Sequence, residues 1–256
     1  MAAPRAVTFD AAGTLIDVAE PVGATYARVA GRHGIRVAAD DVERRFRAAL
    51  AGAPPLAFAP GSPLRVADHE RAWWYAVVRQ ALGRTGDAPG FDACFDALFA
   101  HYAGAAAWQV FPDALPALRT LRARGIRSAV VSNFDARLVP LLAALDVAPW
   151  VDRVVASARA GAAKPDPAVF AVALEALGVP AAEAIHVGDG PVADVEGARA
   201  AGMRAVLLDR ARRRPAVPAG VRIIESLAEL EGVVREDDEH QQHGDRQQGG
   251  GDQHQT

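Results

Sequence analysis

Short runs of β-branched and other apolar residues alternate along the chain with longer amphipathic stretches. Five runs predict buried strands, at residues 6–9, 126–131, 153–156, 184–187 and 204–208, and a weaker run at 221–224 predicts an edge strand. The stretches between them, such as residues 112–125 and 166–178, have helical spacing and end in glycine. Strands that alternate with helices form a parallel, doubly wound sheet with right-handed crossovers. The pattern therefore predicts an α/β fold.

Residues 18–107 interrupt this alternation. They contain no strand pattern but four helical patterns, at residues 20–34, 40–52, 67–83 and 92–104. A connection of this length between two strands is too long for a loop. We therefore expect an all-helical cap domain at residues 18–107, over the carboxyl ends of the strands. It is inserted into a core made of residues 1–17 and 108–234.

The composition excludes several classes of protein. The net charge is −3, and the chain has neither a long basic stripe nor an apolar run that could cross a bilayer. The first residues do not resemble a signal peptide, and the single cysteine, Cys94, rules out an intramolecular disulfide. We expect a cytoplasmic protein that binds neither nucleic acid nor membrane. Residues 235–256 are polar and without apolar anchors, so we expect a disordered tail there.

Polar residues gather directly after the predicted strands, where parallel sheets bind their ligands. They are Asp10 and Thr14 after the first strand, Ser132 and Asn133 at the second, Lys164 beyond the third, and Asp189 and Asp194 after the fourth. A carboxylate can attack phosphorus, while donors and cations stabilise the phosphoryl oxygens. Asp10 and Asp189 would repel each other unless a hard cation lay between them, and Mg²⁺ suits such a site best.

Four segments resemble, in order, the four motifs of the haloacid dehalogenase-like (HAD) hydrolase superfamily. They are FDAAGTL, VVSNFD, AAKPDPAVF and HVGDGPVADVEGARAAGMRAV. The resemblance covers the chain from residue 6 to about residue 230 and includes a cap between the first two motifs. It implies a Rossmann-like core and a hydrolase acting on a small phosphorylated metabolite.

The resemblance also implies roles for single residues. The catalytic residues would be Asp10 as nucleophile, Ser132 as donor to a phosphate oxygen and Lys164 as bridging cation, with Thr14 and Asn133 binding substrate. Mg²⁺ would be held by Asp10, the backbone carbonyl of Ala12 and Asp189, with Asp194 as a ligand or a support for the ligands.

Ala12 departs from the pattern of the family's phosphatases, which have an aspartate at this position. That aspartate protonates the leaving oxygen and then activates the hydrolytic water. Loss of a general acid/base costs roughly 10²–10⁴-fold in rate, or about 3–5 kcal/mol. The loss should be large for alkoxide leaving groups and small for acyl or aryl phosphates. We therefore predict a magnesium-dependent phosphatase with a weakened acid/base step.

Other functions fit less well. The family's phosphonate-cleaving branch shares the alanine but uses a cap lysine, and Lys164 is the only lysine in this chain. The haloacid dehalogenase branch needs neither metal nor acid and lacks the aspartate that corresponds to Asp189. A sensor of phosphorylated ligands on an inactive hydrolase fold is an alternative because of Ala12. Residues 188–193, GDGPVA, also match a dinucleotide fingerprint, with Asp209 placed to hold a ribose.

Asp135, His186 and the aromatic residues 73–75 have predicted structural roles. We expect Asp135 to cap a helix that begins at Ala136. We expect His186, within a buried strand pattern, to be a hydrogen-bonded core residue. Among the consecutive aromatic residues 73–75, at least one should belong to the cap core, since consecutive positions on a helix point in different directions.

Overall fold

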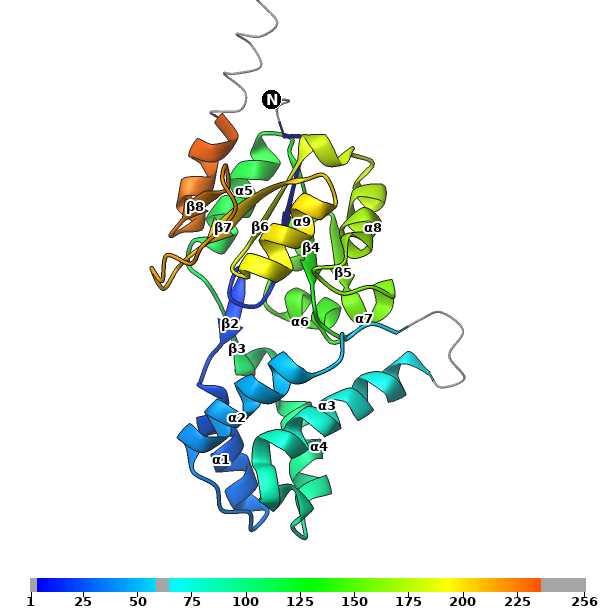
Figure 1. Cartoon of the computed structure of the whole chain (residues 1–256), viewed down its shortest axis with the longest axis vertical. Helices are drawn as coiled ribbons and strands as arrows, with labels where there is room; N and C mark the ends of the chain where they lie inside the picture. Colours follow the sequence, from blue (N-terminus) through cyan, green and yellow to red (C-terminus); the bar gives the residue numbers. More distant parts are fainter. Residues whose placement is uncertain (1–3, 59–64, 236–256) are drawn as a thin grey trace, which may run out of the picture.

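The core of the protein is a six-stranded parallel sheet. In this computed structural model, which describes residues 4–58 and 65–235, the strand order is β5-β4-β1-β6-β7-β8 (Figure 1). The strands are β1 (Ala6–Phe9), β4 (Arg127–Ser132), β5 (Arg153–Ala156), β6 (Ala184–Gly188), β7 (Arg204–Leu208) and β8 (Arg222–Ile224), and all neighbours are parallel. The predicted α/β class is confirmed. Of the predicted tail at residues 235–256, Arg235 is helical and pairs with Glu231, and residues 236–256 lie outside the described residues.

Helices cover both faces of the sheet. Alternate residues of β4 face opposite sides, so Val130 packs with α5 (Ala114–Ala123) and α6 (Leu138–Ala144), while Val131 packs with α8 (Pro167–Leu177) and α9 (Gly197–Ala200). Burial on both faces explains why the strands are almost continuously apolar. Further helical elements of the core are α7 (Ser157–Ala160), η3 (Ala148–Trp150), η4 (Ala181–Glu183), the π-helical η5 (Pro191–Glu196) and η6 (Leu227–Glu229), and residues 230–235 are also helical.

The predicted strand at 126–131 is shifted by one residue. The backbone N–H of Ile126 donates to the carbonyl of Leu121, 3.0 Å away, and so closes the end of α5 instead of joining the sheet. β4 consequently begins at Arg127 and ends at Ser132.

Four helices form the cap, which lies at the end of the molecule away from the N-terminus (Figure 1). They are α1 (Val22–Arg32), α2 (Ala39–Gly52), α3 (Val66–Leu82) and α4 (Phe91–His101), with the short turns η1 (Gly83–Asp87) and η2 (Ala105–Ala107). The cap has its own hydrophobic core, which includes Tyr26, Val78, Cys94 and Phe95. No helix within the described residues is long and apolar enough to span a membrane.

A small antiparallel ribbon joins the cap to the core. It pairs β2 (Ile16–Val18) with β3 (Trp108–Val110), so that Ile16 lies opposite Val110. The sequence pattern did not predict either strand, because three residues are too few to show an alternation of apolar and polar positions. The chain therefore enters and leaves the cap through two adjacent, hydrogen-bonded segments.

Candidate active site

The site lies where three adjacent strands end. Phe9, the last residue of β1, is level with Val130 of β4 and Val187 of β6. Asp10 follows directly, and its backbone N–H donates to the carbonyl of Val187 at 3.0 Å. Ser132 ends β4 and Asp189 follows β6, so the register brings both close to Asp10. This is the edge at which a parallel sheet gathers its functional groups.

The turn after Asp10 depends on a glycine. Gly13 has a φ of +83°, and a Cβ at this position would lie 2.5 Å from Oδ2 of Asp189. Only glycine therefore allows the turn to approach that carboxylate. Thr14, the next residue, is fully buried, and its Oγ1 has no hydrogen-bond partner in the described part of the chain.

Lys164 is buried between two carboxylates. Its Nζ lies 2.8 Å from Oδ1 of Asp10 and 2.5 Å from Oδ1 of Asp194. Burial disfavours the ammonium form, but the two carboxylates outweigh burial and raise the pKa of Lys164. The site thus holds a permanent positive charge next to the Asp10 carboxylate.

Asn133 fixes the main chain that carries this lysine. Its Nδ2 donates to the carbonyl of Lys164 at 2.9 Å, and its Oδ1 accepts from the N–H of Lys164 at 2.8 Å. Because both ends of the amide are engaged, Asn133 positions Lys164, a role that the sequence did not predict. Substrate binding by Asn133 stays a prediction.

Asp194 is held from three sides. Its Oδ1 contacts Lys164 and lies 3.0 Å from Nε2 of His186, and its Oδ2 accepts from the N–H of Gly190 at 2.7 Å. Burial alone would raise the pKa of Asp194, but Lys164 and His186 outweigh it and lower that pKa. A Cβ at Gly188 would lie 2.2 Å from Cγ of Asp194, so the close approach requires glycine there too.

His186 is the buried, hydrogen-bonded residue that its strand pattern predicted. Its Nδ1 lies 2.8 Å from Oγ1 of Thr8, and burial lowers the pKa of His186. A neutral ring that accepts from Thr8 donates through Nε2 to Asp194. This link to Asp194 could not be predicted from the sequence, because His186 looks like an ordinary strand residue.

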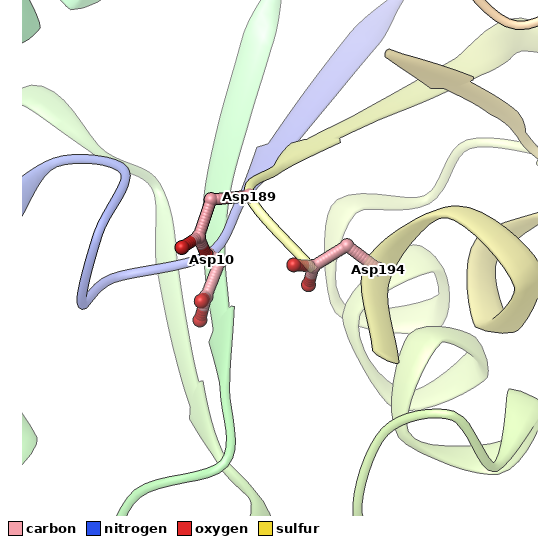
Figure 2. A group of neighbouring side chains, drawn as sticks. All are labelled: Asp10, Asp189 and Asp194. Carbon is pink, nitrogen blue, oxygen red and sulfur yellow. The ribbon is translucent and has the colours of Figure 1, made fainter. Parts of the chain in front are cut away.

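Three carboxylates converge at the site (Figure 2). One carboxylate oxygen each of Asp10, Asp189 and Asp194 lies within 4.8 Å of the other two. Partial removal from water and repulsion by Asp10 and Asp194 raise the pKa of Asp189 to about 7. At the Asp189 carboxylate, burial and the two neighbouring carboxylates therefore outweigh the attraction of Lys164.

This donor set fits Mg²⁺. Carboxylate oxygens are the hard ligands that the ion prefers, and the oxygens of Asp10, Asp189 and Asp194 lie close enough together to surround one cation. A cation there would also lessen the repulsion that helps to raise the pKa of Asp189. Both oxygens of Asp194 already have protein partners, so Asp194 suits the support of Lys164 and of the other carboxylates better than direct ligation.

Asp135 accepts a local hydrogen bond of the capping type, from the backbone N–H of Arg137 to its Oδ1 at 2.9 Å, but it does not cap a helix that begins at Ala136. α6 begins at Leu138, not at Ala136, and the Asp135 carboxylate forms a short ion pair with Arg137 and accepts from the indole of Trp74 at 2.5 Å. The N–H of Ala136 donates to Glu70 of the cap at 3.0 Å. The bonds to Trp74 and Glu70 tie residues 135–137 to the cap, and no local helix signal predicts that link.

The aromatic residues 73–75 divide as the helical geometry predicts. Tyr75 packs edge-on against Phe91 and Phe95 of the cap core. Trp73 and Trp74 instead line a cavity of about 290 Å³ that also reaches Ala12 and Asn133.

Asp209 has a local structural role that a dinucleotide site does not require. Its carboxylate accepts from the backbone N–H groups of Arg213 and Arg214 at 3.0 and 2.6 Å. The turn at residues 188–193 holds Asp189 at the edge that Asp10 occupies (Figure 2).

A parallel sheet with these motifs at its carboxyl edge and a helical cap after the first strand defines the HAD-like hydrolases. The model of the haloacid dehalogenase-like hydrolase family matches residues 4–202. The chain belongs to this family.

Individual relatives agree with this assignment. The chain is 36% identical over 208 residues to the haloacid dehalogenase-like hydrolase domain-containing protein 3 of Danio rerio, covering 80% of this chain and 85% of that protein. A crystal structure of a HAD phosphatase from Thermococcus onnurineus has a TM-score of 0.60 and 26% identity, covering 90% of this chain and 97% of the other. A 2-haloacid dehalogenase from Pseudomonas syringae pv. Tomato DC3000 has a TM-score of 0.60 and 28% identity, covering 91% and 99%.

Proposed function

We propose that the protein is a magnesium-dependent phosphatase of a small phosphorylated compound and works through an aspartyl phosphate on Asp10. One observation carries the proposal. The Asp10 carboxylate lies 2.8 Å from a buried ammonium and beside Asp189, whose pKa is raised to about 7. Nucleophile, fixed cation and the place for a second cation thus share one edge of the sheet. The similar structure from Thermococcus onnurineus is that of a HAD phosphatase, which supports hydrolysis of a phosphate compound.

In the first step the phosphoryl group is transferred to Asp10, and Lys164 and Ser132 assist. An oxygen of Asp10 attacks phosphorus, and the bond from phosphorus to the leaving oxygen breaks. Lys164 neutralises charge on the transferring group, held in place by Asp194 and by Asn133. Ser132, at the end of β4, donates its hydroxyl to a phosphoryl oxygen.

The metal has one task. Mg²⁺ held by Asp10, Asp189 and the carbonyl of Ala12 would supply positive charge for the phosphoryl oxygens and lessen repulsion between the carboxylates.

The methyl group of Ala12 can neither give nor take a proton. The leaving oxygen must therefore depart as an anion, and water must attack the aspartyl phosphate without a general base at this position. Both steps remain possible for good leaving groups, so the proposed enzyme is selective rather than inactive.

The experiment measures release of inorganic phosphate from acetyl phosphate, with Mg²⁺ and with a chelator. Acetyl phosphate is suitable because its leaving group needs no protonation. We expect turnover that requires Mg²⁺ and that falls by roughly 10³-fold or more in Asp10→Asn. Asp41→Asn is the matched control, since Asp41 forms only an exposed ion pair with Arg44 on α2 of the cap.

Two other results would replace the proposal. Binding of phosphate with Mg²⁺ but no turnover would favour the sensor function, the alternative that Ala12 suggests because it cannot act as a general acid. Chloride release from 2-chloropropionate without Mg²⁺ would favour a dehalogenase.

A further inference from the structure

The space beside Ala12 is a cavity with an unusual lining. It measures about 290 Å³ and extends from Ala12, Asn133 and Phe134 of the core to the cap. Its other walls include the aromatic residues Phe46, Trp73, Trp74, Phe99, Tyr102 and Trp108. Aromatic rings bind other rings through offset or edge-to-face contacts. The volume is near the lower end of the usual range for ligand pockets, about 300–1,000 Å³, which suits a group of one or two rings.

Several polar side chains of this lining already have protein partners. The guanidinium of Arg137 pairs with Asp135 at 2.6 Å and lies 3.9 Å from the centre of the Phe99 ring. The Asn133 amide holds Lys164, and Oδ1 of Asp17 accepts from the N–H of Val18 at 2.8 Å. The buried hydroxyl of Tyr102, also in the lining, has no hydrogen-bond partner within the described residues and can bind one polar group. A leaving group rich in hydroxyl, amino or carboxylate groups would still lose more hydration than this lining replaces.

The chemistry at Ala12 points to the same leaving group. Without an acid at this position, the leaving oxygen must carry the electron pair of the broken bond by itself. A phenoxide spreads that charge into its ring, whereas an alkoxide cannot. The aromatic walls and the alanine are separate features, and both favour an aromatic alcohol.

We infer that the substrate is an aryl phosphate, a phosphate monoester of an aromatic alcohol, whose ring lies in the cavity lined by Ala12 and the aromatic residues of the cap. The inference rests on the proposed function and names its substrate class. As an oxygen of Asp10 bonds to phosphorus, the aryl oxygen leaves with the bonding pair. Water then attacks phosphorus, the Asp10 oxygen regains its pair, and one proton of that water ends on the phenol while the other stays on phosphate.

Leu50→Ala tests the cavity with a small expected effect on folding. This residue of α2 lines the cavity but is 43% exposed, so its truncation should disturb folding little. Val172 on α8 is 40% exposed and belongs to the core domain, away from the cavity lining, which makes Val172→Ala the control.

The test compares three substrates. Phenyl phosphate has the ring and a good leaving group, cyclohexyl phosphate has similar size but an alkoxide leaving group, and acetyl phosphate has a good leaving group without a ring. We expect phenyl phosphate to have a lower KM than acetyl phosphate and a kcat roughly 10²-fold above that of cyclohexyl phosphate. Leu50→Ala should raise the KM for phenyl phosphate by roughly fivefold and leave acetyl phosphate unchanged, and Val172→Ala should change neither.

The outcomes separate the inference from the function on which it rests. Turnover of acetyl phosphate without a preference for phenyl over cyclohexyl phosphate would overturn the inference and leave the proposed function intact. The same holds if Leu50→Ala leaves the KM for phenyl phosphate unchanged. If none of the three substrates is hydrolysed with Mg²⁺, both fail.

Discussion

The two halves of the candidate site are built in opposite ways. On the charged half, Lys164, Asp194 and His186 form a buried chain in which each group touches the next at 2.5 to 3.0 Å. On the other half, Ala12 and aromatic side chains line a cavity in which Arg137 and Asn133 already have protein partners. Changes on the charged half should therefore affect every substrate and the stability of the fold, while changes on the apolar half should affect some substrates only.

Removing the buried cation should have the largest effect. Lys164→Met leaves Asp10 and Asp194 buried without their shared ammonium, and we expect turnover of acetyl phosphate to fall by roughly 10³-fold or more. Breaking such a buried pair should lower the free energy of unfolding by about 3–5 kcal/mol, measured by urea denaturation.

Lys164→Arg tests whether a positive charge is sufficient at this position or whether the compact ammonium group is required. It keeps a positive charge, but its planar fork cannot replace a point charge between the two carboxylates. Near-normal activity in Lys164→Arg would show that charge alone is needed at this position.

Supplying the missing acid should alter one class of substrate. Ala12→Asp should raise turnover of alkyl phosphates by roughly 10²-fold and change aryl phosphates much less, because only alkoxide leaving groups need a proton. Ala12→Asn is the matched control, with similar size but no titratable group. An equal gain with Asn would contradict proton transfer as the cause.

Magnesium binding should depend on pH through Asp189. Because the pKa of Asp189 is raised to about 7, its carboxyl group is protonated below that pH and competes with the ion. Apparent affinity for Mg²⁺, measured by calorimetry, should fall by about tenfold for each pH unit below 7. In Asp189→Asn, affinity should be weak at every pH, and an unchanged pH dependence there would assign the effect to another group.

The same raised pKa has a consequence for stability without Mg²⁺. A raised carboxyl pKa means that the folded state holds its proton more tightly than the unfolded state. This stabilising contribution is therefore complete below the ordinary pKa of an aspartate and is lost as the pH rises through about 7. Urea denaturation of the wild type and Asp189→Asn between pH 4 and pH 8, with and without Mg²⁺, should show the loss in the wild type without the ion only.

The smallest effect belongs to His186. His186→Leu leaves Thr8 and Asp194 each without one hydrogen-bond partner, which should lower the free energy of unfolding by about 1–3 kcal/mol. Turnover of aryl and alkyl phosphates should fall by the same few-fold factor, since the change acts through Lys164. A selective loss for one class of substrate would place His186 elsewhere in the mechanism.

Those parts of the molecule that depend on local pattern could be predicted from the sequence. Continuous apolar runs predicted where the core strands lie along the chain, though not their order in the sheet, and the polar residues after the strands predicted that Asp10 and Asp189 lie at one edge. Contacts between distant segments could not be predicted. The β2–β3 ribbon, the grip of Asn133 on Lys164 and the bond from Trp74 to Asp135 all join residues far apart in the chain, and none leaves a periodic signal.

The most direct test of the central claim, that Asp10 accepts the phosphoryl group, is to find that group on the protein. The enzyme is mixed with phenyl phosphate and Mg²⁺, quenched rapidly in acid, digested and analysed by mass spectrometry. We predict one phosphoryl group on the peptide that contains Asp10, in larger amount in the wild type than in Ala12→Asp because water attacks it without a general base. Continued release of phosphate with no phosphoryl group on that peptide, or an equal amount of phosphopeptide in Asp10→Asn, would contradict this mechanism.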